Sequence, residues 1–193
     1  MWYNVGQMKR VVPILALCLS AVAEAVCLPP PGYADMETVT NVPFSVQPDA
    51  AGRLMLSLSC LATPSNNVEA SFGEDLDRDG TLALGEVAFT VGWDCGAWFV
   101  RQGCDGVRVE EPSASPSAVK TLFFTLRHGA GGVPRGLEAT VDGVPAFATL
   151  AAPPAWLDLG LCSLMRLAGR GLPDHGETFT VRATPDAIVI RFR

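Results

Sequence analysis

The chain has 193 residues, of which 49% are hydrophobic and 18% charged, and this composition predicts one globular domain with a sizeable core. The same composition excludes a disordered tail, and the 19 glycines and 15 prolines recur with no period, which excludes fibrous and coiled-coil proteins. The formal net charge is −6 and the isoelectric point is near 4.8, so the surface should repel nucleic-acid phosphates and bind no nucleic acid.

The N-terminal segment predicts a secretory signal peptide. Lys9 and Arg10 form a short basic region, residues 11–22 are almost wholly apolar, and residues 23–25 read Ala-Glu-Ala, the small-residue pattern that signal peptidase accepts. A membrane span is the weaker alternative. The 12 apolar residues include Pro13 and are fewer than the roughly 20 that cross hydrocarbon.

Cleavage of this signal defines the predicted domain organisation. Residues 1–25 would be removed, and residues 26–193 would form a single domain with no membrane span. The protein would then be secreted or held at the cell surface. Whether translation starts at Met1 or Met8 is left open.

Five cysteines remain after cleavage, in a compartment where disulfides can form. Because five is odd, at least one thiol stays free or pairs outside the chain. We predict a disulfide between Cys95 and Cys104, since Gly96 and Gly103 let the chain double back over a short loop. The alternative is that both are buried free thiols. The pairing of the others stays open: Cys27, Cys60 and Cys162.

Alternation of apolar and polar residues predicts β-strands along most of the mature chain. The clearest segment is 53–61, where Leu54, Leu56 and Leu58 share one face. Strands are predicted, in chain order, over residues 42–47, 53–61, 68–72, 87–91, 97–101, 107–110, 119–127, 137–141, 144–150, 178–183 and 188–192. Asp142-Gly143 predicts a tight hairpin, and only residues 159–168 could be helical.

Many short strands with regular turns predict an all-β fold. We expect an antiparallel β-sandwich of the jelly-roll or immunoglobulin-like kind. No internal repeat and no clear linker divides residues 26–193.

Residues 75–86 carry the one specific chemical motif. They read DLDRDGTLALGE, which matches D-x-D-x-D-G followed by five residues and Glu. Over these 12 residues the chain resembles the calcium loop of EF-hand and dockerin-type proteins. The resemblance implies five calcium ligands, the side chains of Asp75, Asp77, Asp79 and Glu86 and the backbone carbonyl of Thr81. It also implies a sharp turn at Gly80, a water at Ala83 and a core-facing Leu82.

The flanks of this motif depart from an EF-hand. Residues 68–72 and 87–91 are strand-like, and Gly85 stands where the exit helix would run. We therefore expect a calcium loop that joins two strands and that stabilises the domain rather than senses calcium. The alternative is a solvated acidic turn, because Asp and Gly are ordinary turn residues.

An aromatic and acidic segment follows the loop. Trp93, Asp94 and Trp98 could form a ligand platform on which a sugar stacks, with Asp94 accepting hydroxyl hydrogen bonds. The alternative is that the tryptophans belong to the core, and that Asp94 completes the calcium shell or caps a turn.

Catalysis has little support in the sequence. His128 and His175 are predicted to be exposed turn residues, and no acyl-nucleophile elbow or zinc-ligand spacing occurs. A glycosidase needs only two facing carboxylates. Nothing singles out a pair among the candidates Asp94, Glu110, Glu111 and Glu138.

The combined prediction is an exported calcium-binding β-sandwich that binds a surface ligand, such as a glycan or a cell-surface protein. One alternative is a structural or interaction subunit of a cell-surface assembly, which an unpaired strand edge at residues 42–47 or 188–192 would favour. The other alternative is a small carbohydrate-active hydrolase.

Overall fold

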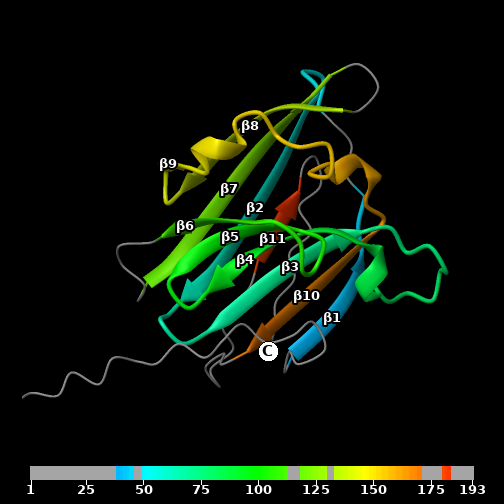
Figure 1. Cartoon of the computed structure of the whole chain (residues 1–193), viewed down its shortest axis with the longest axis horizontal. Coiled ribbons are helices and arrows are strands. Elements are labelled where there is room, and N and C mark those ends of the chain that lie inside the picture. Colours follow the sequence, from blue (N-terminus) through cyan, green and yellow to red (C-terminus); the bar gives the residue numbers. More distant parts are fainter. Residues whose placement is uncertain (1–37, 46–48, 113–117, 130–132, 171–179, 184–193) are drawn as a thin grey trace, which may run out of the picture.

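The computed structural model describes residues 38–45, 49–112, 118–129, 133–170 and 180–183, and in it two antiparallel β-sheets pack face to face (Figure 1). The antiparallel β-sandwich predicted from the alternating pattern is therefore confirmed. The predicted signal peptide, the strand predicted at 188–192 and His175 lie outside the described residues.

The first sheet has six strands, and the candidate calcium loop belongs to it. In spatial order they are β1 (Thr38–Pro43), β10 (Leu164–Arg170), β3 (Asn67–Gly73), β4 (Val87–Asp94), β5 (Ala97–Gln102) and β6 (Arg108–Pro112). Strand β1 is an edge strand, paired within the described ranges only with β10. Strand β3 lies between β10 and β4 and is buried along its whole length.

The second sheet has five strands. In spatial order they are β11 (Thr180–Ala183), β2 (Arg53–Ala62), β7 (Ala118–His128), β8 (Pro134–Val141) and β9 (Val144–Ala146). The described helices are three short 3-10 turns, η1 (Leu84–Glu86), η2 (Ala148–Leu150) and η3 (Leu159–Leu161). None of the helices in the described ranges is long and apolar enough to cross a membrane.

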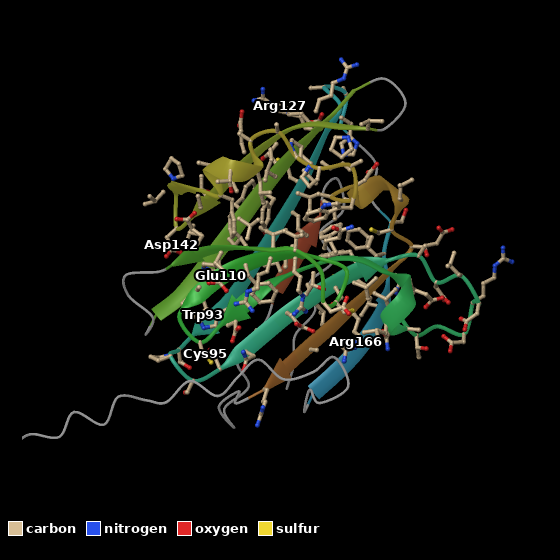
Figure 2. The ribbon with its side chains drawn as sticks, viewed as in Figure 1. Trp93, Cys95, Glu110, Arg127, Asp142 and Arg166 are labelled. Carbon is tan, nitrogen blue, oxygen red and sulfur yellow. The ribbon has the colours of Figure 1, made fainter. Side chains whose placement is uncertain are left out.

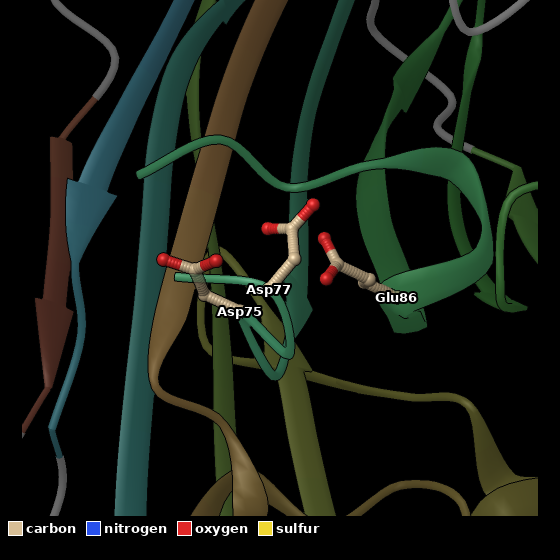
Figure 3. Close-up of side chains that lie close together, drawn as sticks. All are labelled: Asp75, Asp77 and Glu86. Carbon is tan, nitrogen blue, oxygen red and sulfur yellow. The ribbon is translucent and has the colours of Figure 1, made fainter. Parts of the chain in front are cut away.

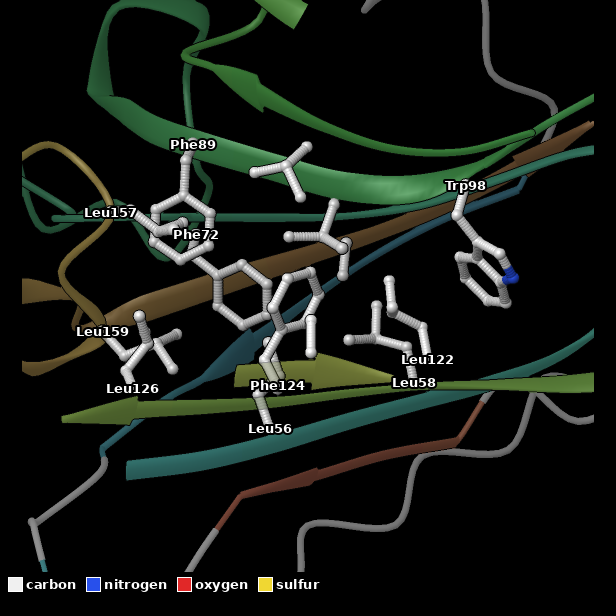
Figure 4. Packing of buried hydrophobic residues seen from close by; sticks show 14 of the residues in the cluster. Leu56, Leu58, Phe72, Phe89, Trp98, Leu122, Phe124, Leu126, Leu157 and Leu159 are labelled. Carbon is white, nitrogen blue, oxygen red and sulfur yellow. The ribbon is translucent and has the colours of Figure 1, made fainter. Parts of the chain in front are cut away.

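The core lies between the two sheets, as the side chains in Figure 4 show. Leu54, Leu56 and Leu58 of β2 alternate inward and are at most 1% exposed. Opposite them, Phe72 packs against Phe89 with ring centroids 5.0 Å apart. Burial of each such side chain stabilises the fold by about 1.5 to 3 kcal/mol. This gain explains why segments with an apolar residue at every second position form strands of the sandwich.

Two sequence predictions of local structure are corrected. Residues 159–168 are not a helix: after η3, Met165 and Leu167 alternate inward as part of β10, because hydrogen bonding to β1 and β3 overrides a weak local preference. The strand predicted over 144–150 ends at Ala146, since Phe147 turns the chain with a left-handed backbone, φ 54°.

The predicted hairpin at Asp142-Gly143 is confirmed. These residues connect β8 to β9 and have φ values of 50° and 82°. Positive φ at both central residues is the geometry that matches the right-handed twist of the paired strands.

Candidate metal centre

The loop of residues 74–86 connects two neighbours in the six-stranded sheet, β3 and β4. A register shift after Phe72 places Gly73 opposite Val87, and the Glu74 N–H donates to the Glu86 carbonyl at 3.3 Å. The two ends of the loop are therefore held together by the sheet. The expectation of an acidic loop joining two strands, without the helices of an EF-hand, is confirmed.

Three predicted ligands converge within this loop. One carboxylate oxygen from each of Asp75, Asp77 and Glu86 lies within 4.8 Å of the other two (Figure 3). They occupy positions 1, 3 and 12 of the motif, so the chain must fold back for them to meet. Oxygen ligands at this spacing fit the hard cation Ca²⁺, which binds oxygens at about 2.3 to 2.6 Å.

Backbone amides within the loop hold two of these carboxylates. Asp75 Oδ2 accepts a hydrogen bond from the Gly80 N–H at 3.1 Å. Glu86 uses both oxygens, which accept from the Leu76 N–H at 2.8 Å and the Ala83 N–H at 2.9 Å. The turn that makes this possible occurs at Gly80, with φ 81°, a region that favours glycine.

Asp79 and Thr81 are turned toward each other in the same loop. Asp79 Oδ1 accepts from the Thr81 hydroxyl at 2.5 Å and from the Thr81 N–H at 2.7 Å. The hydroxyl first, and the amide second, lower the pKa of Asp79 below 3.8. The structure thus brings together three of the four predicted carboxylates, whereas the fourth, that of Asp79, is hydrogen-bonded to Thr81.

The charge of this cluster is not compensated within the described part of the chain. No ion pair between described residues involves Asp75, Asp77 or Glu86. Asp75 Oδ1 is a buried atom that accepts no hydrogen bond. Close carboxylates repel each other by about 1 to 4 kcal/mol per pair. A divalent cation bound among them would neutralise this repulsion.

The loop is fixed to the sheet through Leu82. This side chain is buried, as predicted, and packs in a small cluster with Val87, Leu164 and Cys104, separate from the main core. Its N–H donates to Asn41 Oδ1 on β1 at 3.1 Å. The loop therefore lies against the side of the sheet that faces away from the main core.

The predicted sugar platform is not formed by the tryptophans. Trp93 and Trp98 have no exposed surface and belong to the main core, where their rings meet edge to face at 5.7 Å. Trp93 Nε1–H donates to the Thr63 carbonyl at 2.9 Å, which satisfies its polar group away from water. The alternative interpretation, that both tryptophans belong to the core, is correct.

Asp94 lies on the opposite side of β4 from Trp93, because successive residues of a strand alternate. Its carboxylate accepts a hydrogen bond from Asn67 Nδ2 and pairs with Arg108 at 2.7 Å. It therefore neither completes the calcium cluster nor is free to accept sugar hydroxyls.

The same face carries a buried ion-pair network that the sequence analysis missed. Glu69 pairs with Arg101 at 3.3 Å and with Arg166 at 3.4 Å. Arg101 and Arg108 also lie over the Phe99 ring, 5.4 and 4.3 Å from its centroid. Burial raises the pKa of Glu69, although both arginines oppose the shift. The carboxylates of Glu69 and Asp94 are thus already paired with arginines. Because the paired residues lie on β3, β4, β5, β6 and β10, the network links these five strands to one another.

The predicted disulfide between Cys95 and Cys104 is wrong. Cys104 is a free, buried thiol, whereas Cys95 is disulfide-bonded, so the two do not pair with each other. Cys95 follows β4 and Cys104 follows β5, so the six residues of β5 hold them about 20 Å apart. A disulfide requires Cα atoms within about 7 Å. Figure 2 shows Cys95 beside Trp93, at the end of the sheet away from the acidic loop.

His128 is also not the exposed turn residue that was predicted. Its side chain is 4% exposed, and Nδ1 lies 3.8 Å from Asp158 Oδ1. The nearby Cys162 Sγ lies 3.5 Å from the Asp158 carbonyl oxygen. Burial raises the pKa of Cys162 to about 12, which favours the neutral thiol at neutral pH.

Comparisons with known proteins leave the family of this chain open. No family model and no curated protein matches it. Among solved structures, sheep galectin-11 in complex with glycerol is similar over 76% of this chain and 96% of its own, with 14% identity and a TM-score of 0.46. A tetrameric galectin from the ball sponge Cinachyrella covers 81% of this chain and 100% of its own, with 14% identity and a TM-score of 0.40. At TM-scores below 0.5, neither likeness supports an inference about function.

Proposed function

We propose that the protein is an exported β-sandwich in which calcium, bound by the loop of residues 75–86, stabilises the fold. The observation that carries this proposal is the convergence of the carboxylates of Asp75, Asp77 and Glu86 in one loop. The carboxylates of Asp75 and Glu86 also accept hydrogen bonds from backbone N–H groups of that loop. Buried Asp75 Oδ1, which accepts no hydrogen bond, supports it. The carbonyl of Thr81 and the carboxylate of Asp79 are the further ligands that the motif supplies.

The gain in stability follows from mass action. Extracellular modules meet calcium at about 1 mM, and with a dissociation constant of about 10 µM the ion adds roughly 2.7 kcal/mol to the free energy of unfolding. For a domain of this size that corresponds to a midpoint about 5 to 11 °C higher. The proposed export is consistent with such a role, because a low-affinity site would be filled by the calcium found outside the cell.

Calcium removal tests the proposal. Thermal unfolding of the purified protein should show a midpoint lower by this amount in EDTA than in about 1 mM calcium. Titration calorimetry should show one calcium bound. Glu86→Gln should abolish the effect of calcium, because the glutamine cannot supply two anionic oxygens.

Glu74→Gln is the matched control. It makes the same change one residue before the motif, at an exposed side chain that is not part of the carboxylate cluster. It should leave both the calcium affinity and the midpoint shift unaltered. Calorimetry without a binding heat for the wild-type protein would refute the proposal.

A second function, binding of a surface ligand, is favoured by one cavity. We propose that a glycan unit binds in the cavity of about 440 Å³ that lies against β6, β8 and β9. Glu111, Glu138 and Thr140 supply polar groups for hydroxyls, and Pro145 and Ala146 supply apolar walls for the carbon faces of a sugar. The volume is within the usual range of small-molecule sites.

A glycan array with a matched pair of variants tests this second proposal. Glu111 Oε2 accepts from the Phe147 N–H at 2.9 Å, and Glu111→Gln keeps a side-chain oxygen that can accept it. This variant should lose glycan binding, whereas Glu110→Gln, on the other side of the strand, should retain it. An array without binding, or equal binding by both variants, would rule out the cavity as a sugar site.

A further inference from the structure

The acidic loop covers a small apolar cluster on the outer side of the six-stranded sheet. Leu82 is the loop's contribution to this cluster and is 3% exposed. Gly73 shows how closely the loop lies on the sheet, since a Cβ there would be 2.9 Å from Leu82 Cδ1. Leu82 directly follows the proposed ligand Thr81 in the chain, so the position of the Leu82 side chain depends on the position of the proposed ligands.

Cys104 is the residue of this cluster that the acidic loop covers. The residue is 9% exposed and shares the cluster with Leu82, Val87 and Leu164. Its Sγ lies 3.8 Å from the Leu84 carbonyl oxygen, so the loop contacts the sulfur directly.

The backbone that carries Cys104 is fixed independently of the loop. The Gly103 N–H donates to the Ala88 carbonyl at 2.8 Å, and the Gly103 carbonyl accepts from Thr90 Oγ1 at 2.9 Å. Both contacts are made to β4. An opening of the loop would therefore expose the thiol without moving the strand turn that carries it.

We infer that calcium in the 75–86 loop controls access to the Cys104 thiol, with the side chain of Leu82 and the backbone carbonyl of Leu84 as the lid. This inference rests on the proposed calcium function. Without the ion, repulsion among the carboxylates of Asp75, Asp77 and Glu86 favours an open loop, and Leu82 leaves the cluster. With the ion bound, the lid is closed and the thiol is shielded from oxidants and from thiol exchange.

The size of the effect follows from linkage. If the lid opens only when the ion has left, calcium slows modification of Cys104 by the factor by which it depletes the empty state. At about 1 mM calcium and a dissociation constant of about 10 µM this factor is roughly 100. Burial, which raises the pKa of Cys104 to about 11, acts in the same direction by keeping the covered sulfur a neutral thiol.

Site-resolved thiol labelling tests the inference. The wild-type protein is treated with N-ethylmaleimide in 1 mM calcium or in EDTA, well below either unfolding midpoint, and the modified cysteines are quantified by peptide mass spectrometry. Cys104 should be labelled about 100-fold faster in EDTA. Cys162, which is buried in the main core, should be equally slow in both and reports global unfolding.

Two leucine variants separate the lid from the ligands. Leu82→Ala keeps every proposed ligand but removes the apolar contact, so Cys104 should be labelled faster than in the wild type even in calcium. Leu84→Ala is the matched control: its side chain is 57% exposed, and the variant keeps the carbonyl that meets the sulfur. It should behave as the wild type.

Each result decides one question. If calorimetry shows calcium binding but Cys104 is labelled at the same rate with and without EDTA, the lid is refuted and the calcium function stands. If Cys104 and Cys162 accelerate together in EDTA, the thiol is exposed by global unfolding and the lid is again refuted. Absence of calcium binding by calorimetry overturns the function on which the lid depends.

Discussion

Replacing Gly73 by alanine should prevent the acidic loop from closing in the form that we propose binds calcium. Gly73 is the last residue of β3, and the loop folds back directly over it. A Cβ at this position would lie 2.0 Å from the Glu86 carbonyl oxygen and 2.9 Å from Leu82 Cδ1. The first of these contacts is with backbone, which cannot rotate away as a side chain would.

The magnitude follows from these distances. Carbon and oxygen atoms pack at about 3.5 Å, so Glu86 would have to retreat by roughly 1 to 1.5 Å. Calcium tolerates a range of only about 0.3 Å in its distance to oxygen. We therefore expect calcium affinity to fall at least tenfold, or about 1.4 kcal/mol. Overpacking should also cost about 1 to 3 kcal/mol of stability in the calcium-free protein.

Gly85→Ala is the matched control for this variant. Gly85 lies in the same loop, next to the ligand Glu86, but a Cβ there meets no atom within 4 Å and its φ is not positive. Both variants are compared with the wild type by calcium calorimetry and by urea unfolding with and without EDTA. Only the Gly73 variant should lose affinity. If it binds calcium like the wild type, or if Gly85→Ala loses as much, the described packing of the loop on β3 is wrong.

Two further predictions concern ionisable side chains. Glu69→Ala should destabilise the domain by about 3 to 5 kcal/mol in urea unfolding, because the buried Arg166 and the partly buried Arg101 each lose an ion pair, whereas Glu110→Ala, at a half-exposed pair, should cost less than about 1 kcal/mol. Equal losses would contradict the paired, buried network. In the calcium-free protein, Thr81→Val should raise the pKa of Asp79 toward 3.8, measured by carboxyl NMR titration. Because this folded-state pKa is lowered, the contribution of Asp79 to stability is present above pH 3.8 and is lost as the pH falls through the folded value. An unchanged titration would mean that the hydroxyl does not hold the carboxylate.

The fold could be predicted because burial on one side of a strand leaves a period in the sequence. Leu54, Leu56 and Leu58 show that period, and the structure buries all three. The segment 159–168 was misjudged because apolar residues alone do not tell a buried strand from a helix. What decides there is hydrogen bonding of β10 to β1 and β3, which are distant in the chain.

The convergence of acidic side chains in this loop could be predicted because they are close in sequence and match a motif whose spacing suits a single Ca²⁺ ion. The ion-pair network of Glu69, Arg101 and Arg166 could not. These residues belong to three different strands, and only the register of the sheet shows that they meet. The disulfide prediction failed for a related reason, since Gly96 and Gly103 flank the strand β5 rather than a tight loop.

The continuous burial of β3 restricts which substitutions this segment can accept. An antiparallel strand usually has one side in water, where polar exchanges are nearly neutral. Here one side meets the main core, and the other meets the Glu69 network and the acidic loop. A saturation mutagenesis map of the domain should therefore show no alternation along residues 67–73, but a uniformly intolerant block, in contrast to the every-second-residue pattern of β2.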